Sequence, residues 1–239
     1  MKKSLLVLAL AAAFAPVLAQ AEAGDWVVRL RATNVSPSEN SNLASQTTSS
    51  YDAATTDLLY KSTSANLTVD NNTIPELDIS YYITKNIAAE LILALGTRHE
   101  VAISGMGAGA AVSNANLGSV NLLPPTLTAQ WHFMPDQTFD PYVGAGVAYV
   151  LGMDRSLTAQ SAGVGSGSQP IRIERSNFGG VFQAGFDVNL QDKWLVNFDV
   201  KKLWVSTDVE LNLLNGGWKK IDSLDLNPLV VSIGFGKKF

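Results

Sequence analysis

The sequence predicts the all-β fold class, as an eight-stranded antiparallel transmembrane β-barrel of the outer-membrane type. Three observations predict it. Apolar and polar residues alternate with a period of two in eight segments. Most of these segments reach the ~9–11 residues with which a β-strand crosses a bilayer. The connections between them alternate between short and long, which is typical of barrels that have short turns at one end and long loops at the other.

The chain begins with a predicted secretory signal peptide over residues 1–23. Two lysines precede an apolar run over 5–19, and Ala21-Glu22-Ala23 fits the small-x-small cleavage pattern. A retained membrane anchor is the alternative, but the run is short for the ~20 residues of a spanning helix. We therefore expect export and cleavage after residue 23, or earlier after Ala19, leaving one barrel domain over residues 24–239.

The first four predicted strands each place apolar residues on one face and polar or small residues on the other. Arginines fill the second face of the first strand, acidic residues that of the second, and threonines with a glutamine that of the fourth. The apolar faces are Trp26, Val28, Leu30 and Ala32 in 25–35; Leu77, Ile79, Tyr81 and Ile83 in 74–83; Ile87, Ala89, Leu91, Leu93 and Leu95 in 87–99; and Leu127, Ala129, Trp131 and Phe133 in 124–134.

The last four predicted strands follow the same pattern. The alternation of the seventh strand becomes unclear at Lys202, which predicts a β-bulge at that residue. The apolar faces are Val143, Ala145, Val147, Tyr149 and Leu151 in 141–152; Phe178, Phe182, Ala184, Phe186, Val188 and Leu190 in 175–190; Trp194, Val196, Phe198 and Val200 in 194–211; and Leu229, Val231, Ile233, Phe235 and Phe239 in 222–239.

The connections favour a barrel over a soluble β-sandwich, which would bury the same apolar faces in a core. In lipid every backbone group must find a partner, and a closed sheet leaves no unpaired edge. The short connections are 84–86, 135–140 and 191–193, and the long ones are 36–73, 101–123, 153–174 and 212–221.

Composition excludes several classes of function. The chain is 46% hydrophobic and 16% charged, its formal net charge is -4, and it has no cysteine, so neither nucleic-acid binding nor thiolate chemistry is expected. His99 and His132 fall at opposite ends of their strands, which disfavours a shared metal site. Nothing orients Ser104, His99 and Asp154 as a catalytic triad. We predict no enzyme activity, catalytic residue, cofactor or metal.

The predicted inward faces carry charges of both signs at mid-barrel. Isolated buried charges are costly, so these residues are expected to pair and to plug the periplasmic half of the lumen. A selectivity filter is the alternative. The predicted plug residues are Arg29, Arg31, Glu76, Asp78, Glu90, Asp187, Asp199 and Lys201.

The outer half of the barrel is poorer in charge and is predicted to form an apolar funnel. The stretch Val101–Val112 is apolar and rich in glycine, which is unusual for a solvent-exposed loop. We interpret it as part of a hydrophobic mouth, or alternatively as a loop that dips into the lumen or lies against lipid. The predicted funnel residues are Leu95, Val101, Ile103, Met106, Pro124 and Val150.

Several segments resemble the OmpW family of Gram-negative outer-membrane proteins, which includes alkane-import relatives of the AlkL type. They are Ala23-Gly24-Asp25-Trp26, Leu123-Pro124-Pro125-Thr126-Leu127, Asp140-Pro141-Tyr142-Val143-Gly144-Ala145-Gly146 and the end, Ile233 to Phe239. Lys237 departs from the pattern, because family members often carry an aromatic residue there. The resemblance implies an eight-stranded barrel in the outer membrane with a narrow apolar passage, from which small hydrophobic molecules leave sideways.

The expected partners follow from this interpretation. They are outer-membrane lipid and lipopolysaccharide, small hydrophobic solutes, and the barrel-assembly machinery through the C-terminal Phe239, with no nucleic acid. The alternative function is a structural or adhesive barrel whose loops contact host, phage or bacteriocin. The 36–73 segment, rich in Ser, Thr, Asn and Ala, would suit such a surface.

Overall fold

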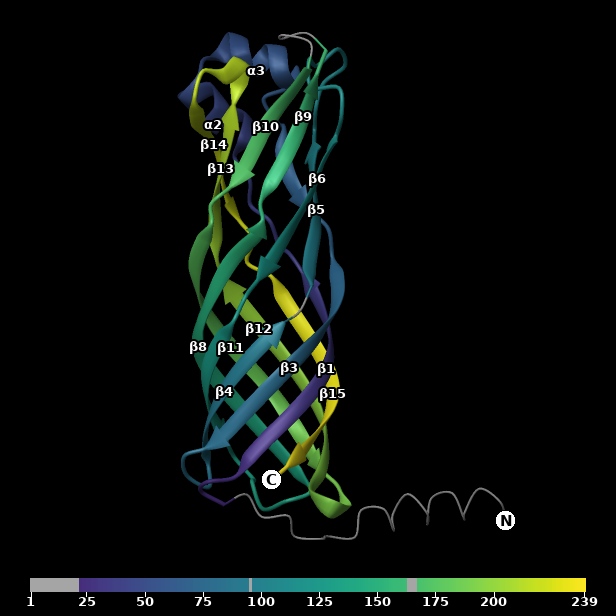
Figure 1. Cartoon of the computed structure of the whole chain (residues 1–239), viewed down its shortest axis with the longest axis vertical. Helices are drawn as coiled ribbons and strands as arrows, with labels where there is room; N and C mark the ends of the chain where they lie inside the picture. Colours follow the sequence, from purple (N-terminus) through teal and green to yellow (C-terminus); the bar gives the residue numbers. More distant parts are fainter. Residues whose placement is uncertain (1–21, 95, 163–166) are drawn as a thin grey trace, which may run out of the picture.

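The computed structural model describes residues 22–94, 96–162 and 167–239, so most of the predicted signal peptide lies outside the described residues. Eight strands form a closed antiparallel ring, in the order β11-β12-β15-β1-β3-β4-β7-β8 and back to β11 (Figure 1). This ring is the predicted eight-stranded barrel. Its strands are β1 (Trp26–Ser36), β3 (Asn72–Tyr82), β4 (Ile87–Ala94), β7 (Thr126–His132), β8 (Phe139–Asp154), β11 (Ser176–Asn189), β12 (Trp194–Trp204) and β15 (Leu229–Lys238).

The predicted faces of the barrel strands are confirmed. Leu30, Leu127 and Ile233 are exposed on the outer wall, whereas the alternate residues of their strands point inward and are buried. The short turns all lie at one end, where the backbones of Trp26 and Phe239 also pair. One of these turns holds the 3-10 helix η1 (Gln191–Lys193).

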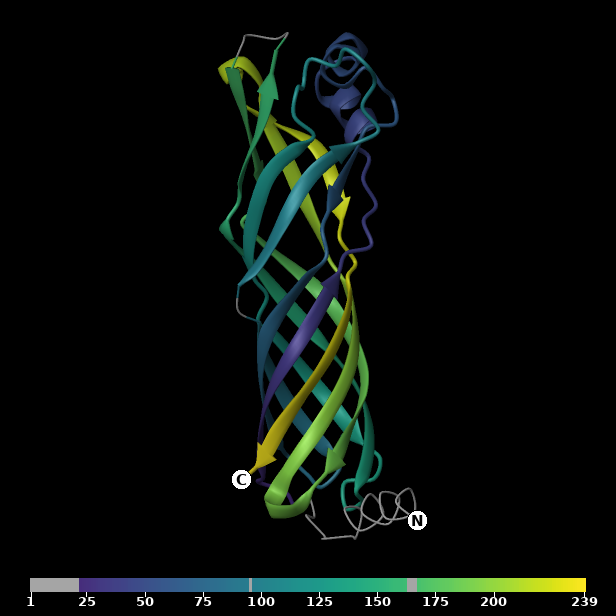
Figure 2. The same cartoon turned by 90° about the vertical axis from the view of Figure 1, so that its right-hand side faces the viewer.

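The predicted long loops are largely wrong, because most of their residues extend the barrel beyond the ring. Figures 1 and 2 show this extension above the ring. Part of it continues the main sheet and part forms a separate four-stranded sheet, β14-β13-β10-β9. Its elements are β2 (Asn66–Val69), β5 (Thr97–Ser104), β6 (Asn116–Leu123), β9 (Ser156–Ser161), β10 (Gly167–Ile173), β13 (Ser206–Asn212), η2 (Leu213–Asn215) and β14 (Trp218–Asp225), with helices α2 (Leu43–Ser50) and α3 (Ala53–Tyr60).

The strand predicted over 87–99 is broken rather than continuous. β4 ends at Ala94 and β5 begins at Thr97, and Gly96 between them has a φ of 73°, a left-handed conformation that favours glycine. The break changes the phase of the alternation. Even-numbered residues of β4 are buried, whereas odd-numbered residues of β5 are buried.

The bulge predicted at Lys202 is also wrong. β12 keeps a regular register with β11 and β15 through Lys202, and the register shift falls later, between Val209 and Glu210. The alternation became unclear there because the inward face changes character. It is polar from Asn197 to Lys201 and, apart from Thr207, apolar from Leu203 to Leu211, although the phase is unchanged.

The 36–73 segment is not an open loop. Its two helices pack over the extension, and α3 is capped by Asp52, whose Oδ1 accepts a hydrogen bond from the Thr55 N–H at 2.6 Å. The Val101–Val112 stretch is not an open loop either, because its first four residues belong to β5. Its last residues pair with α3, since the Val112 N–H donates to the Leu59 carbonyl at 3.1 Å. Neither helix of the described residues is long and apolar enough to cross a bilayer.

Candidate functional site

The lower lumen is filled by a single network of charged side chains. Arg29 lies at its centre: Nη2 is 2.6 Å from Asp187 Oδ2, and Nη1 is 2.6 Å from Ser80 Oγ and 3.4 Å from Asp78 Oδ1. Arg29 lies on β1 and its partners lie on β3 and β11, so the network joins opposite sides of the ring. The side chain of Arg29 is fully buried, and its charge is therefore balanced by protein groups rather than by water.

Arg31 and Lys201 form the upper part of this network. Arg31 pairs with Asp78, with Glu90 at 3.2 Å and with Glu76 at 3.1 Å. Lys201 Nζ lies 3.1 Å from the same Glu76 Oε1 and 2.8 Å from Asp199 Oδ1. All eight residues of the predicted plug are buried and belong to this network, which we call the lumen ion cluster.

Neutral residues complete the lumen ion cluster. Gln183 Nε2 donates to Glu90 Oε2 at 2.7 Å, and Thr128 Oγ1 donates to the same oxygen at 3.0 Å. Five carboxylates face three cationic side chains in the cluster. Each arginine is consequently shared between several acids, and the hydrogen-bond donors of neutral residues help to satisfy the excess carboxylate oxygens.

A second polar group closes the barrel at the short-turn end, and the sequence interpretation missed it. His132 Nδ1 lies 2.7 Å from Asp140 Oδ2 and 3.2 Å from the Tyr82 hydroxyl, and all three residues are buried. The inward phase of His132 was visible in the alternation. Tyr82 and His132 lie on β3 and β7, the two neighbours of β4, so their contact depends on strand pairing that no local pattern shows.

Above the lumen ion cluster lies an apolar cavity of about 110 Å³. Its floor is formed by Glu76 and Lys201, the uppermost members of the cluster. A cavity of ~150 Å³ with similar walls stays dry and binds benzene, so this somewhat smaller space suits an apolar molecule of at most about six carbons. Apolar residues that line it include Val35, Val69, Ile74, Ile92, Ala94, Val101, Val120, Leu122, Pro124, Val150, Leu157, Ile173, Leu203, Val205, Val209, Leu224, Leu226, Pro228 and Val230.

Three of the six predicted funnel residues line this cavity, namely Val101, Pro124 and Val150. Ile103 lines a smaller cavity of about 10 Å³ in the extension, and Met106 packs against the core around it. Leu95 lies outside the described residues.

The far wall of the cavity, from β12 to β15, was missed by the sequence interpretation. Leu203, Val205 and Val209 keep the odd-numbered phase of Lys201, so following that phase beyond Lys202 would have found them. Leu224 and Val230 reach the cavity from the eighth segment, on either side of the break at residues 226–228 between β14 and β15.

The barrel wall is interrupted beside the cavity, between β3 and the chain that joins β4 to β5. The β3–β4 ladder ends at the Glu76–Ala94 pair, and the ladder resumes at Val69–Val101 of β2 and β5. Between them, none of the described residues in 71–75 pairs with 96–99 through the ladder, although β3 stays paired with β1 on its other side.

Side chains bridge this interruption. Asn72 Nδ2 donates to the Arg98 carbonyl at 2.7 Å, and His99 Nδ1 contacts the Asp70 carbonyl at 2.9 Å. Ile74 on the β3 side, and Ala94, Thr97 and His99 on the β4–β5 side, line the cavity. The interruption is therefore part of the cavity wall.

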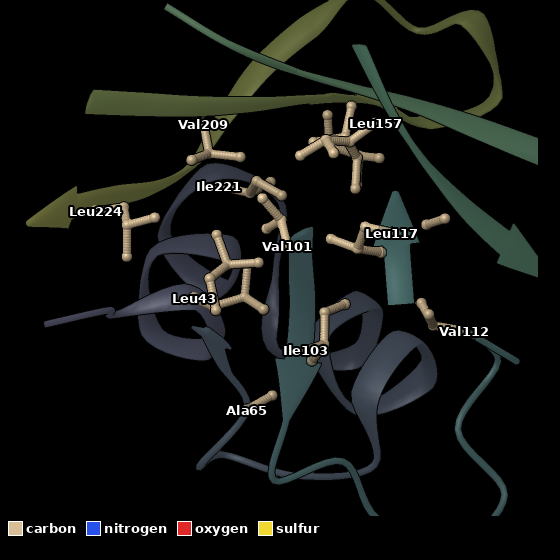
Figure 3. Packing of buried hydrophobic residues seen from close by; sticks show 14 of the residues in the cluster. Leu43, Ala65, Val101, Ile103, Val112, Leu117, Leu157, Val209, Ile221 and Leu224 are labelled. Carbon is tan, nitrogen blue, oxygen red and sulfur yellow. The ribbon is translucent and has the colours of Figure 1, made fainter. Parts of the chain in front are cut away.

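The extracellular side of the cavity is closed by the extension core. Figure 3 shows Leu43, Ile103, Leu157 and Ile221 pointing toward one another from the helices and from both sheets. Tyr60 belongs to this core, and burial raises the pKa of its hydroxyl to about 12. The inward side chains of the extension are thus apolar, the reverse of those in the lower lumen.

The OmpW family profile matches residues 22–239. The chain belongs to the OmpW family. Outer membrane protein W of Vibrio cholerae is 31% identical over the full length of both chains. An outer-membrane protein of Sinorhizobium fredii is 38% identical over 60% of this chain and 56% of its own length. The crystal structure of OprG from Pseudomonas aeruginosa superposes with a TM-score of 0.70 at 27% identity, covering 91% of this chain and 97% of that one.

This OmpW-family chain is an outer-membrane β-barrel of a Gram-negative bacterium, since the relatives are outer-membrane proteins of such bacteria and the neighbouring structure is an outer-membrane barrel. In the described part of the chain, no group of three or more His, Asp or Glu side chains could hold a metal ion. His99 bonds to Asp70, and Ser104 donates to the Asn66 carbonyl, so the described contacts do not join His99, Ser104 and Asp154.

Proposed function

We propose that this protein is a passive transporter of small hydrophobic molecules through the outer membrane. The observation that carries the proposal is the apolar cavity directly above the lumen ion cluster. An apolar solute gains free energy in such a cavity, at roughly 25 cal/mol per Å² of apolar surface removed from water. Passage through the cluster would break several buried ion pairs, so the solute does not continue toward the periplasm along the barrel axis.

The solute leaves sideways, through the interrupted wall beside β3. Two facts support this route. The residues at both edges of the interruption, including Ile74 and Thr97, already line the cavity. The wall there is bridged by side-chain hydrogen bonds of Asn72 and His99 instead of a continuous backbone ladder. Separating the edges therefore costs fewer hydrogen bonds than opening the wall between fully paired strands.

Access from outside requires movement in the extension, because its core covers the cavity. The smaller cavity of about 10 Å³ lies within this core, lined by Leu43 and Leu59 of the helices and by residues of both sheets. This small cavity is a gap in the packing of the extension core, and we infer that the solute passes between the helices and the opposite sheet here.

The test is uptake by proteoliposomes whose outer leaflet contains lipopolysaccharide, which slows unassisted diffusion. We expect a small hydrocarbon to enter faster than a sugar of similar size. Val150→Trp should reduce hydrocarbon uptake by filling the cavity, because Val150 is 8% exposed and lines it. The matched control is Val147→Trp on the same strand, where the 55% exposed side chain faces outward. Equal uptake of both solutes, or equal effects of both variants, would contradict the proposal.

The remaining partners are part of the same proposal. Outer-membrane lipid and lipopolysaccharide contact the outward apolar face, and the assembly machinery recognises the C-terminal strand with Phe239, which is exposed. A surface receptor is the second candidate function. It is supported by α2 and α3, which form an ordered, outward-facing surface rich in Ser and Thr. Absence of transport for every solute would favour this candidate.

A further inference from the structure

We propose that the cavity selects apolar molecules that carry a terminal hydrogen-bond donor, such as short primary alcohols or amines. This inference rests on the proposed transport function and names the substrate class of the same site. It follows from two observations. Few polar atoms reach the otherwise apolar cavity, and some of these have no hydrogen-bond partner among the described residues.

Glu76 presents an unused acceptor at the cavity floor. Its Oε1 accepts from both Arg31 and Lys201, each at 3.1 Å. No hydrogen bond from the described residues reaches its Oε2, although the residue is only 3% exposed and lines the cavity. A carboxylate oxygen at the edge of an apolar cavity gains free energy from a hydrogen bond, so a donor supplied by the solute is favoured there.

His99 presents a second acceptor at the side wall. Its Nδ1 faces the Asp70 carbonyl at 2.9 Å, and a carbonyl only accepts, so Nδ1 carries the proton in the neutral ring. Nε2 is then a lone-pair acceptor with no partner among the described groups. The side chain is 4% exposed and lines the cavity at the edge of the interruption.

The donors that line the cavity are already used. Lys201 Nζ contacts Glu76, Asp199 at 2.8 Å and Ser232. Thr33 Oγ1 donates to Ser232 Oγ at 2.9 Å, and Thr126 Oγ1 donates to the Pro124 carbonyl at 3.1 Å. Thr97 Oγ1 donates to the Leu122 carbonyl. With the Asn177 amide in the orientation that satisfies both its oxygen and its nitrogen, Thr207 Oγ1 donates to the Asn177 side-chain oxygen at 3.2 Å.

Among the described residues, the cavity therefore offers acceptors and no free donor. A solute with a hydroxyl or amino group can satisfy Glu76 or His99 while its hydrocarbon part fills the apolar space. An ether or ester of the same size brings only acceptors and leaves both groups unpaired. Comparison with a ~150 Å³ cavity that holds benzene limits the hydrocarbon part to about six carbons.

The test compares two isomers, 1-hexanol and methyl pentyl ether, which have the same atoms and differ in the hydrogen-bond donor. Full-length processed protein in lipid nanodiscs, with labelled methyl groups, is titrated with each while the NMR signals of Val150 and Val230 are followed. A hydrogen bond to a charged group corresponds to about a tenfold difference in affinity, so we expect 1-hexanol to bind about tenfold more tightly. The Val150→Trp variant, whose larger side chain fills the cavity, measures the binding of each isomer outside the cavity.

Two variants assign the preference to its residues. Glu76→Gln and His99→Leu should each lower the affinity ratio of alcohol to ether, since the first puts an amide donor beside the solute and the second removes an acceptor. A purely structural effect would weaken both isomers equally and leave the ratio unchanged. A ratio unchanged in both variants would overturn the inference.

The comparison of the two isomers is made on the wild-type protein, so it does not depend on whether a variant folds. Equal binding of the two isomers would overturn the inference and leave the proposed transport function standing. If neither isomer nor n-hexane shifts the cavity methyl signals, the inference and the proposed function both fail.

Discussion

At the scale of single residues, the lower lumen holds three cationic side chains that are shared among five carboxylates. Arg29 and Arg31 each contact more than one carboxylate, and both are fully buried. Glu76 marks the boundary of this polar region. One of its oxygens belongs to the ion pairs below, and its side chain also forms the floor of the apolar cavity above. Glu76 thus belongs both to the lumen ion cluster and to the wall of the apolar cavity above it.

Asp52 makes the N-terminus of α3 sensitive to acid. The hydrogen bond from the Thr55 N–H holds the pKa of Asp52 below its ordinary value of about 3.9. Because the folded-state pKa is the lower one, the stabilisation is complete above the unfolded pKa and is lost as the pH falls through the folded value. We expect hydrogen-exchange protection of the α3 amides to fall below about pH 4. Asp52→Asn, which caps without titrating, should remove this pH dependence; the same acid response in both proteins would argue against it.

The identity of the lumen residues was predictable, whereas their partners were not. Alternation with a period of two decides which residues of a strand face inward, and Arg29 and Asp187 both follow it. Their contact joins residues 158 positions apart, and it exists only because the ring closes. His132 and Tyr82 meet because β7 and β3 both pair with β4, which neither strand shows by itself.

At the scale of strands, one rule holds through the ring and reverses in the extension. In the ring, apolar residues face outward and polar ones inward. In the extension, β5 and β13 bury Val101 and Val209 on the inside. Sequence patterns found the strands of the ring but assigned most of the extension to long loops. At the Gly96 break the buried face moves from even-numbered to odd-numbered residues, and beyond Lys201 it changes from mainly polar to mainly apolar. The alternation between apolar and polar residues is therefore hard to recognise at these points.

The two faces of a ring strand should tolerate charge differently. Leu91 lies on the outer face of β4, where Leu91→Arg should destabilise the inserted barrel by roughly 2–4 kcal/mol near the bilayer midplane. Gln183→Arg should cost less, because it adds a cation beside Glu90 in a cluster where acids outnumber bases. Urea unfolding from lipid bilayers measures both. A larger loss for Gln183→Arg would mean that the assigned inside and outside are reversed.

At the scale of the whole molecule, the ring and the extension follow one another along one axis and differ in the polarity of their interiors (Figure 2). The lower part, the ring, is a membrane barrel with a polar interior. The upper one has an apolar core, like the soluble sandwich that the strand pattern also allowed. The cavity lies where the interiors meet, and the wall is interrupted at this level. A strand-by-strand pattern could not locate this junction, since it depends on breaks in several strands coming to the same height.

The central claim is that apolar solutes cross this cavity and leave through the interrupted wall. A reversible disulfide tests it most directly, because the chain has no cysteine of its own. Asn72→Cys with Arg98→Cys spans the interruption, and Ile79→Cys with Leu91→Cys, a pair within the intact β3–β4 ladder, is the control. We predict that oxidation of the first pair stops hydrocarbon uptake into proteoliposomes and that reduction restores it, while the control pair has no effect. Unchanged uptake with the first pair fully oxidised would contradict the account.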